Sequence, residues 1–224
     1  MDERIKDLII KILLKNNIAT FIETGTMYGH TAKWASDYFN IVYTIEKDTQ
    51  LFNSTKEKFN NSNIICINGE SSDCLSSILK EIEGYVIFWL DAHWSGGKTS
   101  GEAKECPILE EIKVINEWNH ECIILIDDAR LFLSPPYEPH KPDHWPTISD
   151  IISKVEKKYI VIIYDVIIVV PFHLKPIVEQ FCIYENTLAW KKRNANISMN
   201  HKQESHLKKS LYHLKRFIAK TKIR

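Results

Sequence analysis

Glycine, net charge and long apolar runs are all scarce in this sequence. Its 224 residues include only seven glycines, so the places where glycines cluster are informative. The 29 basic side chains balance 29 acidic ones, which removes any general attraction to nucleic acid or to an anionic membrane. No apolar run approaches the roughly 20 residues that span a bilayer, and the runs at residues 161–163 and 166–170 have the length of strands. The sequence therefore predicts a globular domain with no transmembrane segment.

Paired cysteine motifs are also absent. The five cysteines, at positions 66, 74, 106, 122 and 182, are odd in number and include no CxxC pair. Scattered cysteines of this kind are typical of reduced thiols in the cytoplasm. Residues 1–15 carry acids and lysines through their apolar stretch, which is unlike a signal peptide. We therefore expect a cytoplasmic protein, and the sequence leaves its assembly open, a homodimer included.

Apolar periodicity predicts strands and helices that alternate along the chain. Helical spacing is found at residues 3–16, 31–39, 49–59, 73–82, 108–118 and 148–158. Apolar stretches of strand length lie at residues 19–23, 41–46, 63–67, 85–91 and 122–127, and a hairpin is expected at 159–164 and 166–170 about Tyr164-Asp165. This alternation predicts βαβ units. The fold class is therefore α/β, a doubly wound and mainly parallel sheet with a C-terminal antiparallel hairpin.

The end of the chain has a different character. Residues 201–224 contain eight lysines and arginines, together with apolar side chains at helical spacing: Leu207, Leu211, Leu214, Phe217 and Ile218. A surface helix docked on the domain is one interpretation, and a helix that contacts a membrane surface or a partner protein is the other. We expect one domain over residues 1–190, which includes the helix 3–16, and a basic helical extension over residues 191–224.

Two of the few glycines follow the first predicted strand. Glu23 ends this strand, and Gly25 and Gly29 come before the next helix, in the pattern ExGxxxG. Glycine permits a sharp turn and a close approach of the backbone to a ligand or a neighbour. In doubly wound sheets, ligands bind outside the carboxyl ends of the strands, where this turn lies. The pattern differs from the GxGxxG of dinucleotide-binding domains, and an ordinary turn between strand and helix is the alternative.

Acidic residues also end the second and third strands. Glu46 comes 23 residues after Glu23 and is followed by Lys47. A carboxylate at this point can accept both ribose hydroxyls of a nucleoside. Glu70 follows the third strand within Asn68-Gly69-Glu70-Ser71, where it could alternatively begin a helix.

These three strand ends resemble the cofactor site of class I S-adenosylmethionine-dependent methyltransferases with the Rossmann-like methyltransferase fold. The glycine turn is most similar to motif I of catechol-type O-methyltransferases, which also lacks a third glycine where this chain has Met27. The resemblance implies that Glu23, Gly25 and Gly29 hold the amino-acid end of S-adenosylmethionine. It also implies that Glu46, with Lys47 beside it, holds the ribose and that Glu70 lies near the adenine.

Three further acids follow the fourth and fifth strands. Asp91 ends the fourth, and Asp127 and Asp128 end the fifth. Because neighbouring parallel strands end at the same edge, we expect these carboxylates to converge, and a cation would relieve their repulsion. Oxygen ligands suit Mg²⁺, Mn²⁺ or Ca²⁺. As alternatives, Asp91 could contact S-adenosylmethionine without a metal, and Asp127 or Asp128 could cap a helix or pair with Arg130.

The same acids resemble the metal site of O-methyltransferases of the catechol type and, more closely, of the macrolide-sugar type, over roughly residues 18–170. The resemblance implies a metal, Mg²⁺ or Mn²⁺, held by Asp91, Asp127 and Asp128, which lowers the pKa of a substrate hydroxyl. His93 is the candidate base because its ordinary pKa lies near 6.5, and it could instead be a loop residue. Lys98 is the second candidate, since a lysine follows the corresponding segment in catechol-type enzymes.

Two loops, residues 96–105 and 134–145, are expected to form the acceptor pocket. We predict an O-methyltransferase, assisted by Mg²⁺, that acts on a sugar, a glycan or a polyhydroxylated small molecule. The motif Ser134-Pro-Pro-Tyr137 resembles that of DNA amino-methyltransferases, but it follows the fifth strand here and the fourth strand there, so nucleic acid is disfavoured as a substrate. The sequence is also compatible with a small-molecule N-methyltransferase and with a non-catalytic binding module.

Overall fold

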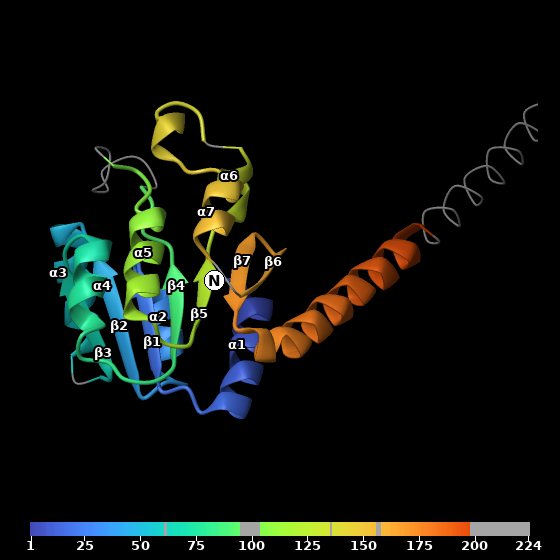
Figure 1. The fold of residues 1–224 in the computed structure, drawn as a ribbon, viewed down its shortest axis with the longest axis horizontal. Coiled ribbons are helices and arrows are strands. Elements are labelled where there is room, and N and C mark those ends of the chain that lie inside the picture. The colour runs from blue at the N-terminus through green and yellow to red at the C-terminus, as the bar shows by residue number, and fades with distance from the viewer. Residues whose placement is uncertain (61, 95–103, 135, 156–157, 198–224) are drawn as a thin grey trace, which may run out of the picture. The chain divides into compact units, whose positions relative to one another are not determined.

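The computed structural model describes residues 1–60, 62–94, 104–134, 136–155 and 158–197 (Figure 1). The chain divides into two compact units, residues 1–177 and 178–224. In the second unit, the described residues 178–197 are helical. The apolar residues of the basic tail lie outside the described residues, and the division at residue 190 stays a prediction.

A single seven-stranded sheet organises the first unit, with the strand order β3-β2-β1-β4-β5-β7-β6. The strands are β1 (Thr20–Thr24), β2 (Ile41–Glu46), β3 (Ile64–Asn68), β4 (Val86–Leu90), β5 (Cys122–Ile126), β6 (Tyr159–Ile163) and β7 (Val166–Val170). The first five strands are parallel to one another, and β7 runs antiparallel to both β5 and β6. The predicted fold class, a doubly wound and mainly parallel sheet with a C-terminal antiparallel hairpin, is confirmed.

Helices cover both faces of this sheet. They are α1 (Glu3–Asn16), α2 (His30–Ala35), α3 (Thr49–Lys56), α4 (Ser71–Ile78), α5 (Ile108–Trp118), α6 (Ala129–Leu133) and α7 (Ile148–Lys154), with 3₁₀ turns η1 (Glu57–Phe59), η2 (Pro142–His144) and η3 (Phe172–Leu174). The prediction missed α6, because a helix of five residues is too short to show a helical period. Within the described residues, no helix is long and apolar enough to cross a membrane.

Neighbouring residues of β1 show which side chains pack on each face of the sheet. Ile22 belongs to the core cluster that α4, α5 and α7 cover, with Leu75, Ile112 and Ile151 as representative partners. Phe21 packs its ring against Trp34 and Phe39, since successive side chains of a strand point to opposite faces. All five residues of β4, of β5 and of β7 are buried. A sheet buried on both faces leaves the edge formed by the strand ends as the place for polar chemistry.

The hairpin turn is built by two residues in the left-handed region, Tyr164 with φ 53° and Asp165 with φ 64°. Two consecutive residues with positive φ form the type I′ turn that matches the twist of an antiparallel hairpin. The guanidinium of Arg4 lies 3.3 Å from the centre of the Tyr164 ring, which ties α1 to the turn. The predicted position of the turn is confirmed.

Candidate functional site

The glycine turn after β1 packs directly on the end of β4. Gly25 has φ +83°, and a Cβ at this position would lie 2.2 Å from the carbonyl oxygen of Asp91. The Gly25 N–H donates to the carbonyl of Ile45 on β2, over 2.9 Å. Only glycine combines this backbone conformation with so close an approach. The turn therefore brings the ends of β1, β2 and β4 together.

Gly29 serves the packing of the helices that follow. It has φ +76°, and a Cβ here would come within 2.8 Å of the Phe59 ring and of the Thr55 methyl group. Between the two glycines, Met27 has φ 47°, in a region that non-glycine residues rarely adopt. Its N–H donates to Glu46 Oε2 over 2.9 Å, and its carbonyl accepts from Thr55 Oγ1 over 3.0 Å. These two hydrogen bonds hold the conformation that a third glycine would adopt freely.

Glu46 ends β2 and binds backbone amides with both carboxylate oxygens. Oε2 accepts from Met27, and Oε1 accepts from the Asp48 N–H over 2.9 Å. A carboxylate has about four acceptor sites, so each oxygen retains capacity for a further hydroxyl. Beside it, Lys47 Nζ lies 2.6 Å from Glu70 Oε2. This pair links the ends of β2 and β3, whose parallel pairing places Glu46 beside Asn68.

A pocket opens above these strand ends. Its lining comprises Gly25, Met27, Ile45, Glu46, Lys47, Leu51, Gly69, Glu70, Ser71, Asp91, Ala92 and His93. Six of these were predicted site residues: Gly25, Glu46, Lys47, Glu70, Asp91 and His93. The pocket lies where the strand order reverses between β1 and β4, which is the ligand site of doubly wound sheets. Of the residues that the prediction missed, Gly69 and Ser71 flank Glu70 in the segment after the third strand.

Two predicted cofactor residues do not line the pocket. Gly29 faces Phe59 and Thr55, as described above. Glu23 is buried beneath the turn, where Oε2 accepts from Thr44 Oγ1 over 2.6 Å. Burial raises the pKa of Glu23 to about 8, against the hydrogen bond from Thr44, which lowers it. A direct contact of these two residues with a ligand stays a prediction.

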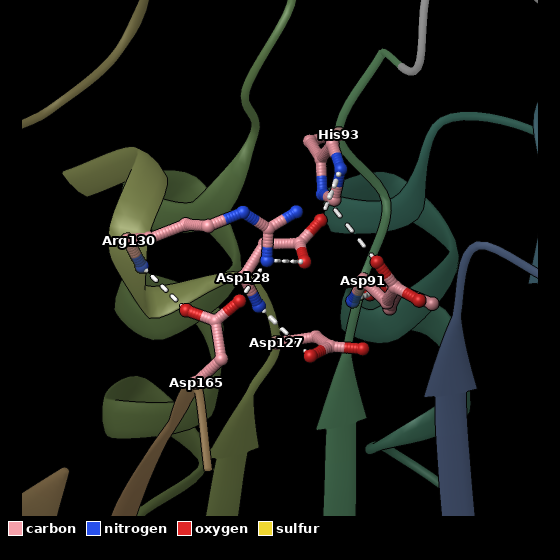
Figure 2. A network of polar contacts seen from close by, with 7 residues as sticks. Asp91, His93, Asp127, Asp128, Arg130 and Asp165 are labelled. Atoms are coloured by element: carbon pink, nitrogen blue, oxygen red, sulfur yellow. Dashed lines mark hydrogen bonds and ion pairs between the residues drawn. The ribbon is translucent and has the colours of Figure 1, made fainter. Parts of the chain in front are cut away.

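An acidic site lies next to the pocket, at the ends of β4 and β5 (Figure 2). Asp91 follows β4, and Asp127 and Asp128 follow β5. His93 lies between the two strand ends: its Nδ1 is 3.4 Å from Asp91 Oδ1, and its Nε2 is 3.0 Å from Asp128 Oδ2. The expected convergence of carboxylates at this edge is therefore observed, with an imidazole between two of them.

The three acids differ in their surroundings. Burial, followed by the charges of Asp127 and Asp128, raises the pKa of Asp91 to about 7 against the opposing effect of His93. Burial also raises the pKa of Asp127. The hydrogen bond from His93 lowers the pKa of Asp128. Of these three carboxyl groups, Asp91 therefore holds its proton most strongly.

The charges of the same three acids act on the pKa of His93. Burial alone would lower the pKa of His93, but the hydrogen bond to Asp128 and the charges of the three acids outweigh burial and raise it above the ordinary value. Its side chain is 13% exposed. His93 is therefore a mostly buried loop residue between two carboxylates, rather than a surface loop residue.

Asp91, His93 and Asp128 each offer a ligand atom within 4.8 Å of the other two, a spacing that could hold a metal ion. Asp127 is not in this group, and its Oδ1 accepts from the Asp128 N–H over 2.8 Å. Asp128 has φ 55°, a left-handed conformation that a short acidic residue tolerates. Metal binding by Asp127 stays a prediction.

Asp128 also forms the ion pair with Arg130 that the sequence left as an alternative. Arg130 Nη1 lies 2.7 Å from Asp128 Oδ1 and makes a second ion pair with Asp165 Oδ2 in the hairpin turn. The Arg130 N–H donates to Asp165 Oδ1 over 2.8 Å. Figure 2 shows these contacts as one network from the hairpin to His93. The hairpin thus fixes the position of Asp128.

A fully buried carboxylate, Glu105, joins the loops around the site. Glu105 has no exposed surface and accepts from Trp145 Nε1 over 2.8 Å and from the Lys141 N–H over 2.9 Å. Its Oε2 also lies 3.1 Å from His140 Nδ1. The Trp145 ring lies 5.5 Å from the His93 ring, centre to centre. Glu105 therefore holds a tryptophan against the imidazole of the acidic site, a role that sequence reasoning missed.

The remaining predicted residues lie outside this arrangement. Lys98, the second candidate base, and Pro135 of the Ser134–Tyr137 motif lie outside the described residues. Tyr137 is 84% exposed, and its segment follows α6 and therefore β5. The motif is thus not at the end of β4, where DNA amino-methyltransferases carry theirs.

Comparisons with known proteins find that this chain is similar to solved structures. No family model and no curated protein matches the sequence. Among solved structures, a Klebsiella pneumoniae protein assigned as an O-methyltransferase is 10% identical with a TM-score of 0.54, over 75% of this chain and 79% of that one. A Staphylococcus aureus protein assigned as a caffeoyl-CoA O-methyltransferase is 15% identical with a TM-score of 0.51, over 75% of this chain and 83% of that one. At such identities the likeness shows the fold, and the predicted Rossmann-like methyltransferase fold is confirmed.

Proposed function

We propose that this chain, which has the fold of class I S-adenosylmethionine-dependent methyltransferases, is itself such an enzyme and methylates an oxygen of a small-molecule acceptor. One observation carries the proposal: the pocket at the reversal of strand order and the Asp91, His93 and Asp128 cluster share two residues, Asp91 and His93. A cofactor in this pocket would have its reactive end beside groups that can bind and deprotonate a hydroxyl.

The pocket offers a distinct contact for each part of S-adenosylmethionine, which would supply the methyl group. Glu46 has unused acceptor capacity for the ribose hydroxyls, and the Lys47–Glu70 pair borders the neighbouring end of the pocket, where adenine would lie. Gly25 lines the pocket with its backbone, and the amino-acid end of the cofactor would lie beside it. Glu23 and Gly29 would support this turn from below.

The donor set of the acidic site fits a divalent cation, Mg²⁺ or Mn²⁺, because it combines carboxylate oxygens and an imidazole nitrogen in a partly buried, negatively charged place. A bound cation would orient adjacent acceptor hydroxyls and lower the pKa of one of them. In the arrangement where the aspartates hold the ion, His93 would receive the released proton, since its pKa is raised by its surroundings. Most of the acceleration would come from alignment of the oxygen with the methyl group.

A sugar, a glycan or another polyhydroxylated molecule is the acceptor class that we favour. Adjacent hydroxyls can reach a cation together, and the acidic site borders the pocket through Asp91 and His93. Methylation of nucleic acid is disfavoured by the position of the Ser134–Tyr137 motif and by the zero net charge. A small-molecule amine as the acceptor and a non-catalytic binding module remain as outcomes of the test below.

The proposal is tested by calorimetric titration of S-adenosylhomocysteine into the protein, first with EDTA, then with Mg²⁺ or Mn²⁺ and a panel of sugars. We expect micromolar binding of the nucleoside in every condition and sugar binding only with the metal. Glu46→Ala should weaken nucleoside binding by at least tenfold, whereas Glu81→Ala, an exposed acid away from the pocket, should not change it. Absence of nucleoside binding in all conditions would favour the binding module instead.

The metal contribution is tested with Asp127→Asn. If Asp127 is a ligand, this variant should lose metal-dependent turnover while it keeps nearly unchanged affinity for S-adenosylhomocysteine. Turnover at the wild-type rate would remove Asp127 from the metal site. Methylation of amines in preference to sugars would replace the hydroxyl acceptor with a nitrogen acceptor and leave the cofactor assignment intact.

A further inference from the structure

We propose that His93 is a metal ligand, which binds one cation together with an oxygen of Asp91 and an oxygen of Asp128, and that the site consequently prefers Mn²⁺ and similar transition ions to Mg²⁺. The inference deepens the proposed function, since it identifies the ion of the same site and gives His93 a role other than that of the base. Binding of the ion itself does not require methyl transfer, so the two can be tested separately.

The geometry favours these three residues over the three aspartates. Asp91, His93 and Asp128 place one ligand atom each within 4.8 Å of the other two, close to the separations of about 3 to 4 Å between donors that share an ion at about 2.1 Å. Asp128 presents Oδ2 to His93, because Arg130 occupies Oδ1. Asp127 Oδ1 instead accepts a backbone hydrogen bond. Within the described residues, the three aspartates do not form a group with this spacing.

The charge balance leaves room for a divalent ion. Four carboxylates, of Asp91, Asp127, Asp128 and Asp165, form the network of Figure 2 together with Arg130 and His93. A His93 that binds a metal is neutral, so if all four carboxylates are ionised, Arg130 balances one of them and a charge of −3 remains. The side chains of His93, Asp128 and Asp91 are only 13%, 23% and 32% exposed, so bulk water screens this charge incompletely. A cation with two charges would neutralise most of it.

The nitrogen donor then determines which ion is preferred. Mg²⁺ is bound mainly by oxygen ligands and holds its water molecules strongly. Imidazole suits transition ions such as zinc, copper, iron and nickel, and affinity for nitrogen sites increases from Mn²⁺ along the first transition row. The packed Trp145 ring and the two neighbouring carboxylates restrict the orientation of the His93 ring. A fixed imidazole supplies a nitrogen ligand without the cost of ordering a free side chain.

Mn²⁺ is the probe, because a nitrogen bound to it can be detected by pulsed electron paramagnetic resonance. The full chain is loaded with Mn²⁺, and the spectra of protein with natural and with ¹⁵N-labelled histidine are compared. We expect a histidine nitrogen coupling that changes with the isotope. This comparison needs no variant, so a variant that fails to fold does not prevent the test.

Variants then assign the coupling. His93→Gln should abolish it and weaken Mn²⁺ binding by at least tenfold in calorimetry, whereas Mg²⁺ binding should change by less than about threefold. His120→Gln, at an exposed histidine, is the matched control and should behave as wild type. In Asp127→Asn the coupling should persist. In the wild type we expect Mn²⁺ to bind at least tenfold more tightly than Mg²⁺.

Each outcome that would contradict the inference contradicts a different part of it. Mn²⁺ binding without a histidine nitrogen coupling would overturn the role of His93, and equal affinities for Mn²⁺ and Mg²⁺ would overturn the preference. Failure of every ion to bind would overturn the inference entirely. Binding of S-adenosylhomocysteine in EDTA is measured on the same protein: its absence, with the nitrogen coupling present, would contradict the proposed function and leave the metal ligand supported.

Discussion

Glu105 is fully buried and Asp91 is partly buried; the two carboxylates lie on adjoining stretches of chain, and their charges are compensated in different ways. The Trp94 N–H donates to the carbonyl of Glu105 over 2.7 Å, so the two stretches are directly linked. Burial alone would raise the pKa of Glu105, but hydrogen bonds from Trp145, Lys141 and His140 outweigh it and lower the pKa below its usual value. Around Asp91, burial and two further acids raise the pKa to about 7.

This difference separates a structural carboxylate from one that is ready for a ligand. Buried charges are stable when they are paired and hydrogen-bonded, and costly when they are not. Glu105 gains its partners from a loop 35 to 40 residues further along the chain, and thereby holds that loop. Asp91 instead lies near two further carboxylates, Asp127 and Asp128, which raise its pKa, and His93 opposes their effect. Substitutions of the two carboxylates should therefore change stability in opposite directions.

The largest effect is expected when the structural carboxylate is removed. Glu105→Ala leaves the buried Trp145 Nε1–H and the partly buried Lys141 N–H without their acceptor, and should lower the free energy of unfolding by about 3 to 5 kcal/mol. Urea denaturation measures this loss. Glu105→Gln, which keeps an acceptor oxygen, is the control and should lose clearly less. Equal losses in the two variants would show that the hydrogen bonds do not carry the stabilisation.

Asp91 should behave in the opposite way, and its effect should depend on pH. Because the pKa of Asp91 is raised on folding from its ordinary value near 3.8 to about 7, its contribution to stability is fully present below pH 4 and is lost as the pH rises through 7. Asp91→Asn, in EDTA, should therefore be more stable than wild type by roughly 1 to 2 kcal/mol at pH 8, a range reduced for partial solvent screening. At pH 4 the two should agree within about 0.5 kcal/mol, the usual range for a substitution without a specific loss. A variant that is less stable than wild type at pH 8 would contradict this account.

A third substitution separates hydrogen bonding from packing in the structural cluster. Trp145→Phe keeps an aromatic ring beside His93 but removes the N–H that donates to Glu105. Since Lys141 and His140 still serve Glu105, we expect a loss of about 1 to 2 kcal/mol in urea denaturation. A loss as large as that of Glu105→Ala would mean that ring shape, rather than the carboxylate, holds the loop.

The smallest effect on stability is expected at the exposed end of the acidic network. Arg130 is 61% exposed, and exposed ion pairs contribute about 1 kcal/mol or less. Arg130→Gln should therefore change the free energy of unfolding by less than about 1 kcal/mol. Its removal of a positive charge next to Asp128 should nevertheless strengthen Mn²⁺ binding, roughly two- to fivefold at low salt. Weaker Mn²⁺ binding would indicate that Arg130 is needed to orient Asp128.

Much of the acidic site could be predicted because the ends of parallel strands are neighbours in space. The pattern located β4 and β5 to within one residue at each end, so that Asp91, Asp127 and Asp128 had to meet. The hairpin was predictable for a related reason, since two residues between short apolar runs leave room for little but a tight turn. Both predictions rely on local periodicity and on the rules of sheet topology.

The features that could not be predicted depend on side-chain contacts that no periodicity in the sequence marks. The contact of Glu105 with Trp145 joins two irregular loops, and no spacing in the sequence marks it. The left-handed conformation of Asp128 and the hydrogen bond from its N–H to Asp127 decide which carboxylates face His93, and aspartate in a strand-end motif can adopt several conformations. The glycine pattern alone assigns Gly29 to a ligand, whereas only the packed ring of Phe59 shows why no side chain fits there.

The bond between the hairpin turn and α6 has a consequence for biosynthesis. Asp165 lies 35 residues after Arg130, whose amide and guanidinium it binds, and it directly precedes β7, which pairs with β5. At about 5 to 20 residues per second, the ribosome needs about 2 to 7 s to add this stretch. A nascent chain can therefore bring together the ends of β1 to β4, which line the pocket, first, and it acquires its fixed acidic site only when the last strands have emerged.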